Sequence, residues 1–217
     1  MPFSLRTVVL IRTHKMISNN KNLLLIFTRN PELGKVKTRL AKTIGNKTAL
    51  EIYKFLLNKT KEVTQNLDCD KAVYYSVKVR ENDIWDANIY QKWQQTGEDL
   101  GFRMQNAFDN AFKNGYKKVI IVGSHLYDLS SEIIEDAYKK LDNSDVVIGP
   151  AEDGGYYLLG MKELQPKIFQ NKAWGTASVR KDTLKDLQKV NVHLLQQLND
   201  VDVIEDIENR EAFAHFL

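Results

Sequence analysis

The sequence predicts an α/β fold, a three-layer sandwich in which helices cover both faces of a mostly parallel central sheet. Short apolar runs alternate with segments of helical periodicity from residue 23 almost to the end. Strands that are joined by helical crossovers pair in parallel. With 217 residues, 43% of them hydrophobic, the chain can bury a full core without disulfides. Its lone Cys69 fits a reducing, cytoplasmic compartment.

Each element has its own signal. Apolar runs predict strands at residues 23–28, 72–77, 119–123, 145–148, 156–159 and 192–195. Apolar residues at helical spacing predict a helix that opens at Asn46, a second over 99–114 and a third capped near Ser130 or Ser131. A fourth is expected over 176–190, and a last one near Ile204. The run at 156–159 follows two glycines, so we expect a hairpin or an antiparallel strand there.

Residues 22–217 are predicted to form one domain, because no repeat or Pro-rich linker divides them. Residues 1–21 are expected to be an N-terminal extension, with Met16 as the candidate biological start. Apolar runs stay far below the roughly 18 residues that span a bilayer, so no membrane span is expected. The 31 Lys and Arg alternate with 28 Asp and Glu along the predicted helices, which argues against nucleic acid as a partner and leaves a small anionic ligand open.

Ligands of open α/β sheets bind at the carboxyl ends of the strands, which selects the loops at 28–40, 123–129 and 149–157. The chemistry of the first loop suits a polyphosphate. Gly34 lets the backbone approach an oxygen, Lys37 supplies a point charge and Arg39 a bidentate fork. A solvated basic turn explains this loop equally well. The chain has neither a Walker A motif nor a G-x-G-x-x-G stretch, so a P-loop or dinucleotide site is not expected.

The other two loops contribute carboxylates. Asp128 is a candidate metal ligand, although a helix cap explains it with equal weight. Asp153 precedes two glycines, as in a hairpin. The neighbouring Glu152 and the position at the carboxyl edge of the sheet favour a functional role. The four histidines lack ligand spacing, which argues against zinc, and no G-x-S-x-G elbow surrounds Ser124.

Three stretches together resemble a known family. They are IFTRNPELGKVKTRL at 26–40, GEDLGFRM at 97–104 and GPAEDGGYYLLG at 149–160. They are similar to the bacterial family called rSAM/selenodomain-associated transferase 1, whose members are glycosyltransferase-like and have a GT-A (nucleotide-diphospho-sugar transferase) fold. Further matches are Trp174-Gly175-Thr176 and Asp200-Val201-Asp202, so the resemblance covers about residues 22–208.

The resemblance implies a nucleotide or nucleotide-sugar site with a divalent cation, Mg or Mn. It implies catalytic roles for Lys37, Arg39 and Asp153, and metal contacts for Asp128, Asp153 and His125. The implied binding residues are Thr28, Arg29, Gly34, Lys37, Thr38, Arg39, Asp99, Arg103, Ser124, Gly154, Gly155 and Trp174. At the second loop the family typically has an aspartate where this chain has His125. Imidazole suits Mg poorly, so weak Mg binding or a dependence on Mn is expected.

A metal-dependent glycosyltransferase that uses a nucleotide-diphospho-sugar donor is the function implied first. The cation, Lys37 and Arg39 would stabilise the departing diphosphate. Asp153 would hold the metal or act as a base toward an acceptor hydroxyl. One alternative is a nucleotidyltransferase that acts on a nucleoside triphosphate and a phosphorylated acceptor. The other is a non-catalytic nucleotide-binding protein, for which His125 is the supporting feature. Nucleobase, sugar, acceptor and oligomeric state stay open.

Overall fold

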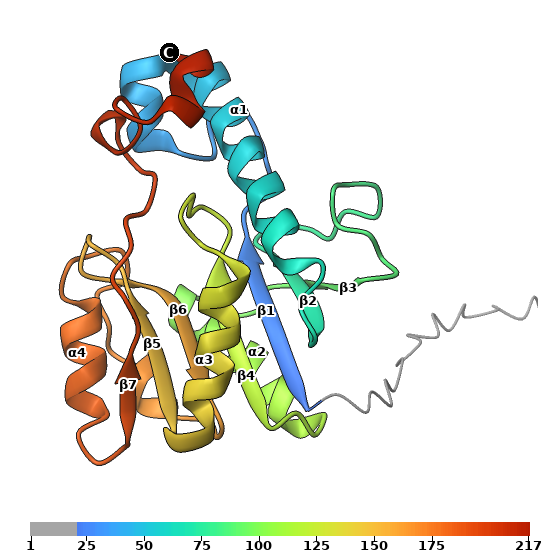
Figure 1. Cartoon of the computed structure of the whole chain (residues 1–217), viewed down its shortest axis with the longest axis vertical. Helices are drawn as coiled ribbons and strands as arrows, with labels where there is room; N and C mark the ends of the chain where they lie inside the picture. The colour runs from blue at the N-terminus through green and yellow to red at the C-terminus, as the bar shows by residue number, and fades with distance from the viewer. Residues whose placement is uncertain (1–20) are drawn as a thin grey trace, which may run out of the picture.

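The computed structural model describes residues 21–217, and the expected start at Met16 lies outside them. A seven-stranded sheet of order β3-β2-β1-β4-β6-β5-β7 forms its centre (Figure 1). The strands are β1 Asn22–Thr28, β2 Asp70–Tyr75, β3 Tyr90–Gln94, β4 Lys118–Gly123, β5 Val146–Pro150, β6 Tyr156–Met161 and β7 Val192–Leu194. All neighbours pair in parallel except β6, which runs antiparallel to β4 and β5. The mostly parallel sheet and the antiparallel strand near residue 156 are therefore confirmed.

The alternation of side chains along β1 separates two helical layers. Leu24 and Ile26 pack in one core cluster with α1, Thr38–Thr64, and α3, Ser131–Asn143. Leu23 and Leu25 pack in a second cluster with α2, Leu100–Lys113, and the short helix η1, Pro166–Phe169. The helix α4, Val179–Asp186, joins the second layer through its own Leu184 and through Leu187, which follows its last turn. Successive strand side chains point to opposite faces, so a continuous apolar run fills both cores, and the predicted three layers are confirmed.

Some boundaries differ from those that the sequence predicts. A helix starts at Asn46 as expected, but a short helical segment from Thr38 precedes it, and non-helical backbone at Gly45 (φ 81°, ψ 158°) separates the two parts of α1. The edge strand β3 was not predicted, because its sequence YQKWQ is polar and only Tyr90 is fully buried. The helix expected near Ile204 is divided into two 3₁₀ turns, η2 at Ile204–Asp206 and η3 at Glu211–Phe216.

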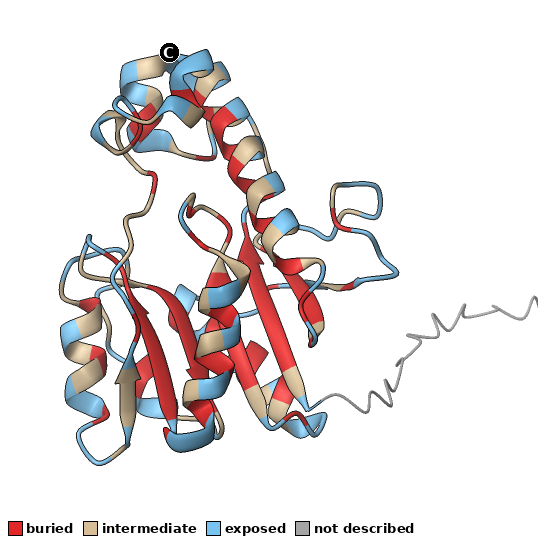
Figure 2. Ribbon diagram, in the orientation of Figure 1, coloured by how far each residue is buried: buried red, intermediate tan, exposed pale blue. Residues whose placement is uncertain are grey.

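A third apolar cluster joins the C-terminal segment to α1. Leu40, Ile52 and Leu56 of α1 are fully buried against Val201, Ile207 and Phe213. Figure 1 shows the C-terminal end beside α1, beyond the edge of the sheet, and Figure 2 shows buried residues in both elements. The segment that follows β7 therefore crosses the carboxyl edge of the sheet to reach α1.

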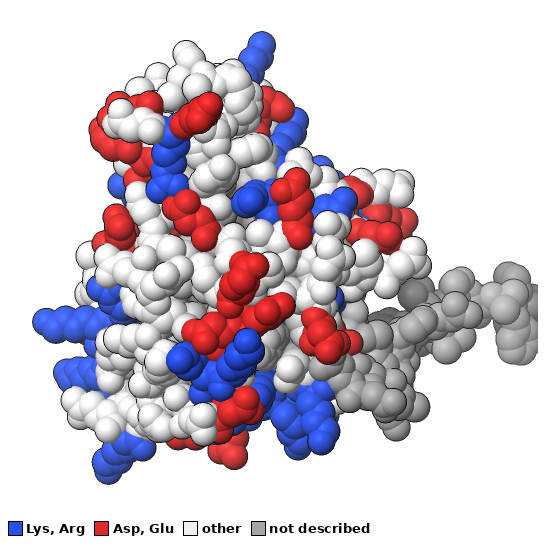
Figure 3. Space-filling view, in the orientation of Figure 1, with Lys and Arg blue, Asp and Glu red and all other residues white. Residues whose placement is uncertain are grey.

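Charged side chains of both signs are interspersed on the face drawn in Figure 3. Within residues 21–217, no helix combines the length and the apolar character needed to cross a bilayer.

Candidate functional site

A cleft of about 750 Å³ lies at the carboxyl ends of β1, β2, β3 and β4. Three hydroxyl groups are linked at the foot of this cleft. Thr28 Oγ1 lies 3.2 Å from Tyr53 Oη and 3.1 Å from Ser124 Oγ, and the Tyr53 and Ser124 hydroxyl oxygens are 3.3 Å apart. Tyr53 Oη also accepts a hydrogen bond from Arg29 N and donates one to Arg29 O. The network therefore fixes the start of the loop at 28–40, here called the basic loop, to the ends of β1 and β4.

The N-terminus of α1 opens into the cleft beside a buried cation. Lys37 precedes the helix in the left-handed conformation (φ 46°, ψ 44°), no side chain caps α1, and its first turn has no acidic residue. The Lys37 side chain is only 5% exposed, and its Nζ lies 2.9 Å from Asp202 Oδ1. Uncapped N–H groups and the helix dipole attract anions, and here they act together with a lysine. This end of the cleft has the chemistry of an oxyanion site.

Three arginines add positive charge around the same cleft. Arg29, Arg39 and Arg103 all line it. Arg39 is 64% exposed, and its Nη1 lies 3.6 Å from Asp202 Oδ2. Arg103 donates from Nε to Gly97 O, which orients its guanidinium group. The exposed arginine side chains can change conformation when a ligand binds, whereas the Lys37 side chain is held in place.

Carboxylates from the C-terminal segment face these cations. Asp200 and Asp202 line the cleft, as does Asp153 from the loop between β5 and β6. The Asp206 carboxylate accepts hydrogen bonds from Asp202 N and Val203 N at 2.7 and 2.8 Å. This bonded turn holds Asp202 in its pairing with Lys37.

Asp200 and His125 form an unusual acid and imidazole pair. Asp200 Oδ2 lies 3.4 Å from His125 Nδ1, and Asp200 Oδ1 is buried without a hydrogen-bond partner in the described part of the chain. Burial, opposed by Lys37 and reinforced by nearby carboxylates, raises the pKa of Asp200 to about 7. Burial and the Lys37 charge lower the pKa of His125 to about 3. At neutral pH the imidazole is therefore uncharged, and Asp200 keeps its proton to a higher pH than an ordinary carboxyl group.

Comparison with known proteins places the chain in a family. A family model described as "uncharacterized protein conserved in bacteria (DUF2064)" matches residues 59–176. The chain belongs to the DUF2064 family. A candidate nucleotide-diphospho-sugar transferase from Desulfovibrio desulfuricans G20 is 30% identical, with a TM-score of 0.78 over 89% of both chains. The expected nucleotide-diphospho-sugar transferase fold is thereby confirmed.

Two further relatives are transferases of nucleotides by name. A 2-phospho-L-lactate guanylyltransferase from Methanocaldococcus jannaschii is 29% identical over 131 residues, which cover 60% of this chain and 56% of the relative. The match thus spans little more than half of that curated protein. A cytidylyltransferase from Leptospira borgpetersenii serovar Hardjo-bovis is 15% identical with a TM-score of 0.54, over 91% of this chain and 88% of that one. That likeness concerns the fold alone.

The DUF2064 chain brings most of the predicted site residues to the cleft. Those that line it are Thr28, Arg29, Lys37, Thr38, Arg39, Arg103, Ser124, His125, Asp153, Gly155 and Trp174. Gly34, Asp99 and Gly154 are not among the lining residues and shape the backbone instead. Asp99 caps α2 by accepting from Phe102 N at 2.8 Å. Gly154 has φ 90°, and a Cβ there would lie 2.6 Å from Ala177 Cα; Gly34 has φ 71° in the basic loop.

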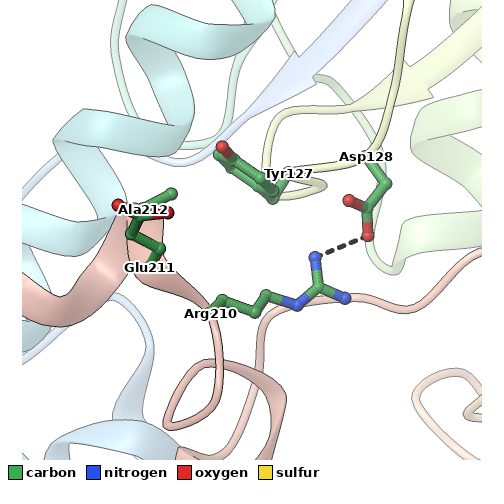
Figure 4. Close-up of a pocket in the computed structure, with 5 residues that line it drawn as sticks. All are labelled: Tyr127, Asp128, Arg210, Glu211 and Ala212. Atoms are coloured by element: carbon green, nitrogen blue, oxygen red, sulfur yellow. Dashed lines mark hydrogen bonds and ion pairs between the residues drawn. The ribbon is translucent and has the colours of Figure 1, made fainter.

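Asp128 lies elsewhere, which corrects the expectation that it shares a metal with Asp153. It lines a separate pocket with Tyr127, Arg210, Glu211 and Ala212 (Figure 4). Arg210 Nη1 donates to Asp128 Oδ2 at 2.6 Å, and the Arg210 guanidinium lies 5.9 Å from the centre of the Tyr127 ring. The arginine neutralises the carboxylate that a cation would need. Ser130, and not Asp128, caps α3, so the alternative role of Asp128 as the cap is also incorrect.

The predicted metal ligands do not form a ready metal site. His125 and Asp153 both line the cleft. Within residues 21–217, however, no three or more His, Cys, Asp or Glu side chains are grouped so that they could hold a metal ion. The Mg or Mn prediction therefore stays a prediction, without an assembled set of ligands.

Sequence reasoning missed several polar lining residues, among them Tyr53, Ser76, Gln95, Asp200 and Asp202. The pair Asp200 and Asp202 was noticed only as part of a resembling motif, with no role. Ser76 follows β2, so the strand-end rule applied to the end of this second strand could have found it. Gln95 follows β3, which the polar sequence concealed.

Proposed function

We propose that this DUF2064 protein is a nucleotidyltransferase that transfers a nucleotide to a phosphorylated acceptor. One observation carries the proposal: the uncapped N-terminus of α1, with the buried Lys37 beside it, opens into the cleft. A triphosphate fits that combination of N–H groups and fixed cation. The guanylyltransferase among the relatives supports the same reaction class.

The chain's own groups suit this transfer. An oxygen of the acceptor phosphate attacks the α-phosphorus, a new P–O bond forms, and the bond from the α-phosphorus to the bridging oxygen breaks. Pyrophosphate leaves with the negative charge of that oxygen. Lys37 and the first-turn N–H groups would stabilise this charge without moving, because Asp202 already holds Lys37 in place. No proton must be removed from a phosphate nucleophile, so the step requires no general base.

The second half of the cleft suits the acceptor. It is lined by Asp153, Gly155 and Tyr156 of the β5–β6 region, by Trp174 and by Arg103 of α2. Arg103 would bind the acceptor's phosphate through bidentate hydrogen bonds from its planar guanidinium group. A divalent cation would supply further charge stabilisation when bound, but the described side chains do not form a site for it, and no step above depends on it.

Glycosyl transfer is the second candidate, because the 30% identical solved structure is a candidate nucleotide-diphospho-sugar transferase. In that reaction Asp153 would take a proton from an acceptor hydroxyl, and a nucleoside diphosphate would leave. The two reactions are separated by their products.

Binding of inorganic tripolyphosphate, followed by isothermal titration calorimetry, tests the phosphate site. We expect Lys37→Met to weaken binding at least about tenfold, because it removes a charge-assisted contact. Lys35→Met is the matched control, since Lys35 is an exposed lysine of the same loop and does not line the cleft. Equal binding by wild type and Lys37→Met would refute the site.

Product analysis tests the reaction. The protein is incubated with nucleoside triphosphates and a panel of phosphorylated acceptors that includes 2-phospho-L-lactate. Acceptor-dependent release of pyrophosphate supports nucleotidyl transfer. Release of nucleoside diphosphate from sugar nucleotides would instead support glycosyl transfer.

A further inference from the structure

The part of the cleft at the ends of β2 and β3 has almost no free hydrogen-bond donors. It is lined by Ser76, Val77 and Gln95. Ser76 N donates to Thr28 O at 3.0 Å, and Gln95 N donates to Tyr75 O at 2.9 Å. The main-chain donors of these two strand ends are thus used within the protein.

A buried asparagine uses the next donors along the chain. Asn30 is 2% exposed, and its Oδ1 accepts from Val77 N at 3.0 Å and from Lys78 N at 3.3 Å. Its Nδ2 donates to Lys78 O at 2.8 Å, which fixes the orientation of the amide. Asn30 therefore removes two further N–H groups from those that a ligand could reach at this end.

The Gln95 side chain presents an acceptor. Its Nε2 donates to Tyr74 O at 2.9 Å and to Thr28 O at 3.3 Å. Because both partners are carbonyl oxygens, the amide nitrogen must face them, and Oε1 is the group left for a ligand. Beside it, the Ser76 hydroxyl can accept or donate.

We propose that this end of the cleft binds the nucleobase and selects guanine, with Gln95 as the specificity-determining residue; the inference rests on the proposed nucleotidyl transfer. The Watson–Crick edge of guanine offers two adjacent donors, N1–H and the 2-amino group. Adenine and cytosine place a ring acceptor next to a single amino group, and uracil places its one N–H between two carbonyls. Gln95 Oε1 and the Ser76 hydroxyl can accept from both donor groups of guanine, whereas each of the other bases offers them only one donor group.

The position is consistent with the phosphate site. β2 neighbours β1, whose following loop leads to Lys37 and α1. A nucleotide with its phosphates at the α1 N-terminus can thus extend its base over the ends of β2 and β3. The acceptor half of the cleft, on the side of β4 and β6, stays free.

Calorimetric titration of wild-type protein with GTP, ITP, ATP, CTP and UTP tests the inference without any substitution. ITP differs from GTP only by lacking the 2-amino group. We expect GTP to bind about tenfold more tightly than ITP, and about 100-fold more tightly than ATP. Equal affinity for all five, or a preference for another base, would overturn the inference while the proposed function stands. Binding of neither tripolyphosphate nor any nucleotide would overturn both.

A pair of variants assigns the selectivity. Gln95→Met should bring GTP and ITP to equal affinity, because the accepting oxygen is gone. Gln94→Met is the matched control: Gln94 is exposed, donates to Val77 O and does not line the cleft, so the difference between GTP and ITP should persist. Retained discrimination in folded Gln95→Met would refute the role of Gln95. If that variant does not fold, the wild-type series still decides the base.

Discussion

Replacing Asp200 by asparagine is expected to stabilise the protein at pH 8 more than at pH 5. Its side chain is 12% exposed, and burial, opposed by Lys37 and reinforced by three neighbouring carboxylates, raises the pKa of Asp200 from 3.8 to about 7. A raised carboxyl pKa means that the native state binds its proton more tightly than the unfolded state does. The native state therefore loses stability as the pH rises from about 4 to about 7, where the buried carboxyl must ionise.

The two pKa values set the size of the effect. The difference between 3.8 and about 7 corresponds to about 4 kcal/mol across the whole window, and about 2 to 3 kcal/mol of this falls between pH 5 and pH 8. An asparagine of the same shape does not ionise. His125 works in the opposite direction, because its lowered pKa costs the native state stability below pH 6.5. Since both proteins retain His125, its contribution largely cancels in the difference.

Urea denaturation at pH 5, 6, 7 and 8 measures the effect. The free energy of unfolding of Asp200→Asn should exceed that of wild type by an amount that grows with pH and levels off above pH 7. Glu152→Gln is the control, because Glu152 is an exposed carboxylate of the neighbouring loop. The difference in free energy of unfolding between this variant and wild type should stay the same across the pH series. A difference for Asp200→Asn that is constant across the series, or that has the opposite sign at pH 8, would refute the reasoning.

Three further predictions test the site and the packing. His125→Asp should raise the affinity for Mg²⁺ in a metal titration, because it adds an oxygen ligand near Asp200; equal affinity in both proteins contradicts this. Gly101→Ala should lower the free energy of unfolding by about 2 kcal/mol, since its Cβ would lie 2.7 Å from the Trp174 ring; unchanged thermal unfolding contradicts this. Asp128→Asn should cost less than about 1 kcal/mol, because the pair with Arg210 is partly exposed, and should leave GTP binding unchanged; lost binding would return Asp128 to the site.

The fold could be predicted because its main signals are local. Leu23 to Phe27 is apolar without interruption, as expected for a strand buried on both faces, and the structure places it inside the sheet, between β2 and β4. β3 was missed because an edge strand needs only backbone pairing with one neighbour, and its polar side chains carry no apolar pattern. The predicted helix start at Asn46 coincides with the break in α1 at Gly45, but the short segment from Thr38 was missed because the tertiary packing of Leu40 stabilises it.

Reasoning from the residues could predict the site only in the loops that follow a strand, whereas Arg103 and Trp174 were expected from the family resemblance. Lys37, Ser124 and Asp153 reach the cleft because the sheet brings the strand ends together. Asp200 and Asp202 reach it along a segment that leaves β7 and crosses to α1, and no local pattern specifies that path. Asp128 has the same local pattern as a functional carboxylate. The Asp128 carboxylate is paired with Arg210, 82 residues later in the chain, and only the tertiary structure shows this pairing.

The charges in the cleft couple the phosphate site to the C-terminal segment that carries Asp200 and Asp202. Lys37 is already paired with Asp202, and two other carboxylates line the same space. A triphosphate brought to the α1 N-terminus therefore meets negative charge that must be compensated. The native groups offer one means: Asp200, with a pKa of about 7, takes up a proton when a further anion raises that pKa. Calorimetry of GTP binding in two buffers of different ionisation enthalpy should detect this uptake at pH 8 without metal. Added Mg²⁺ should abolish it if a cation supplies the charge instead.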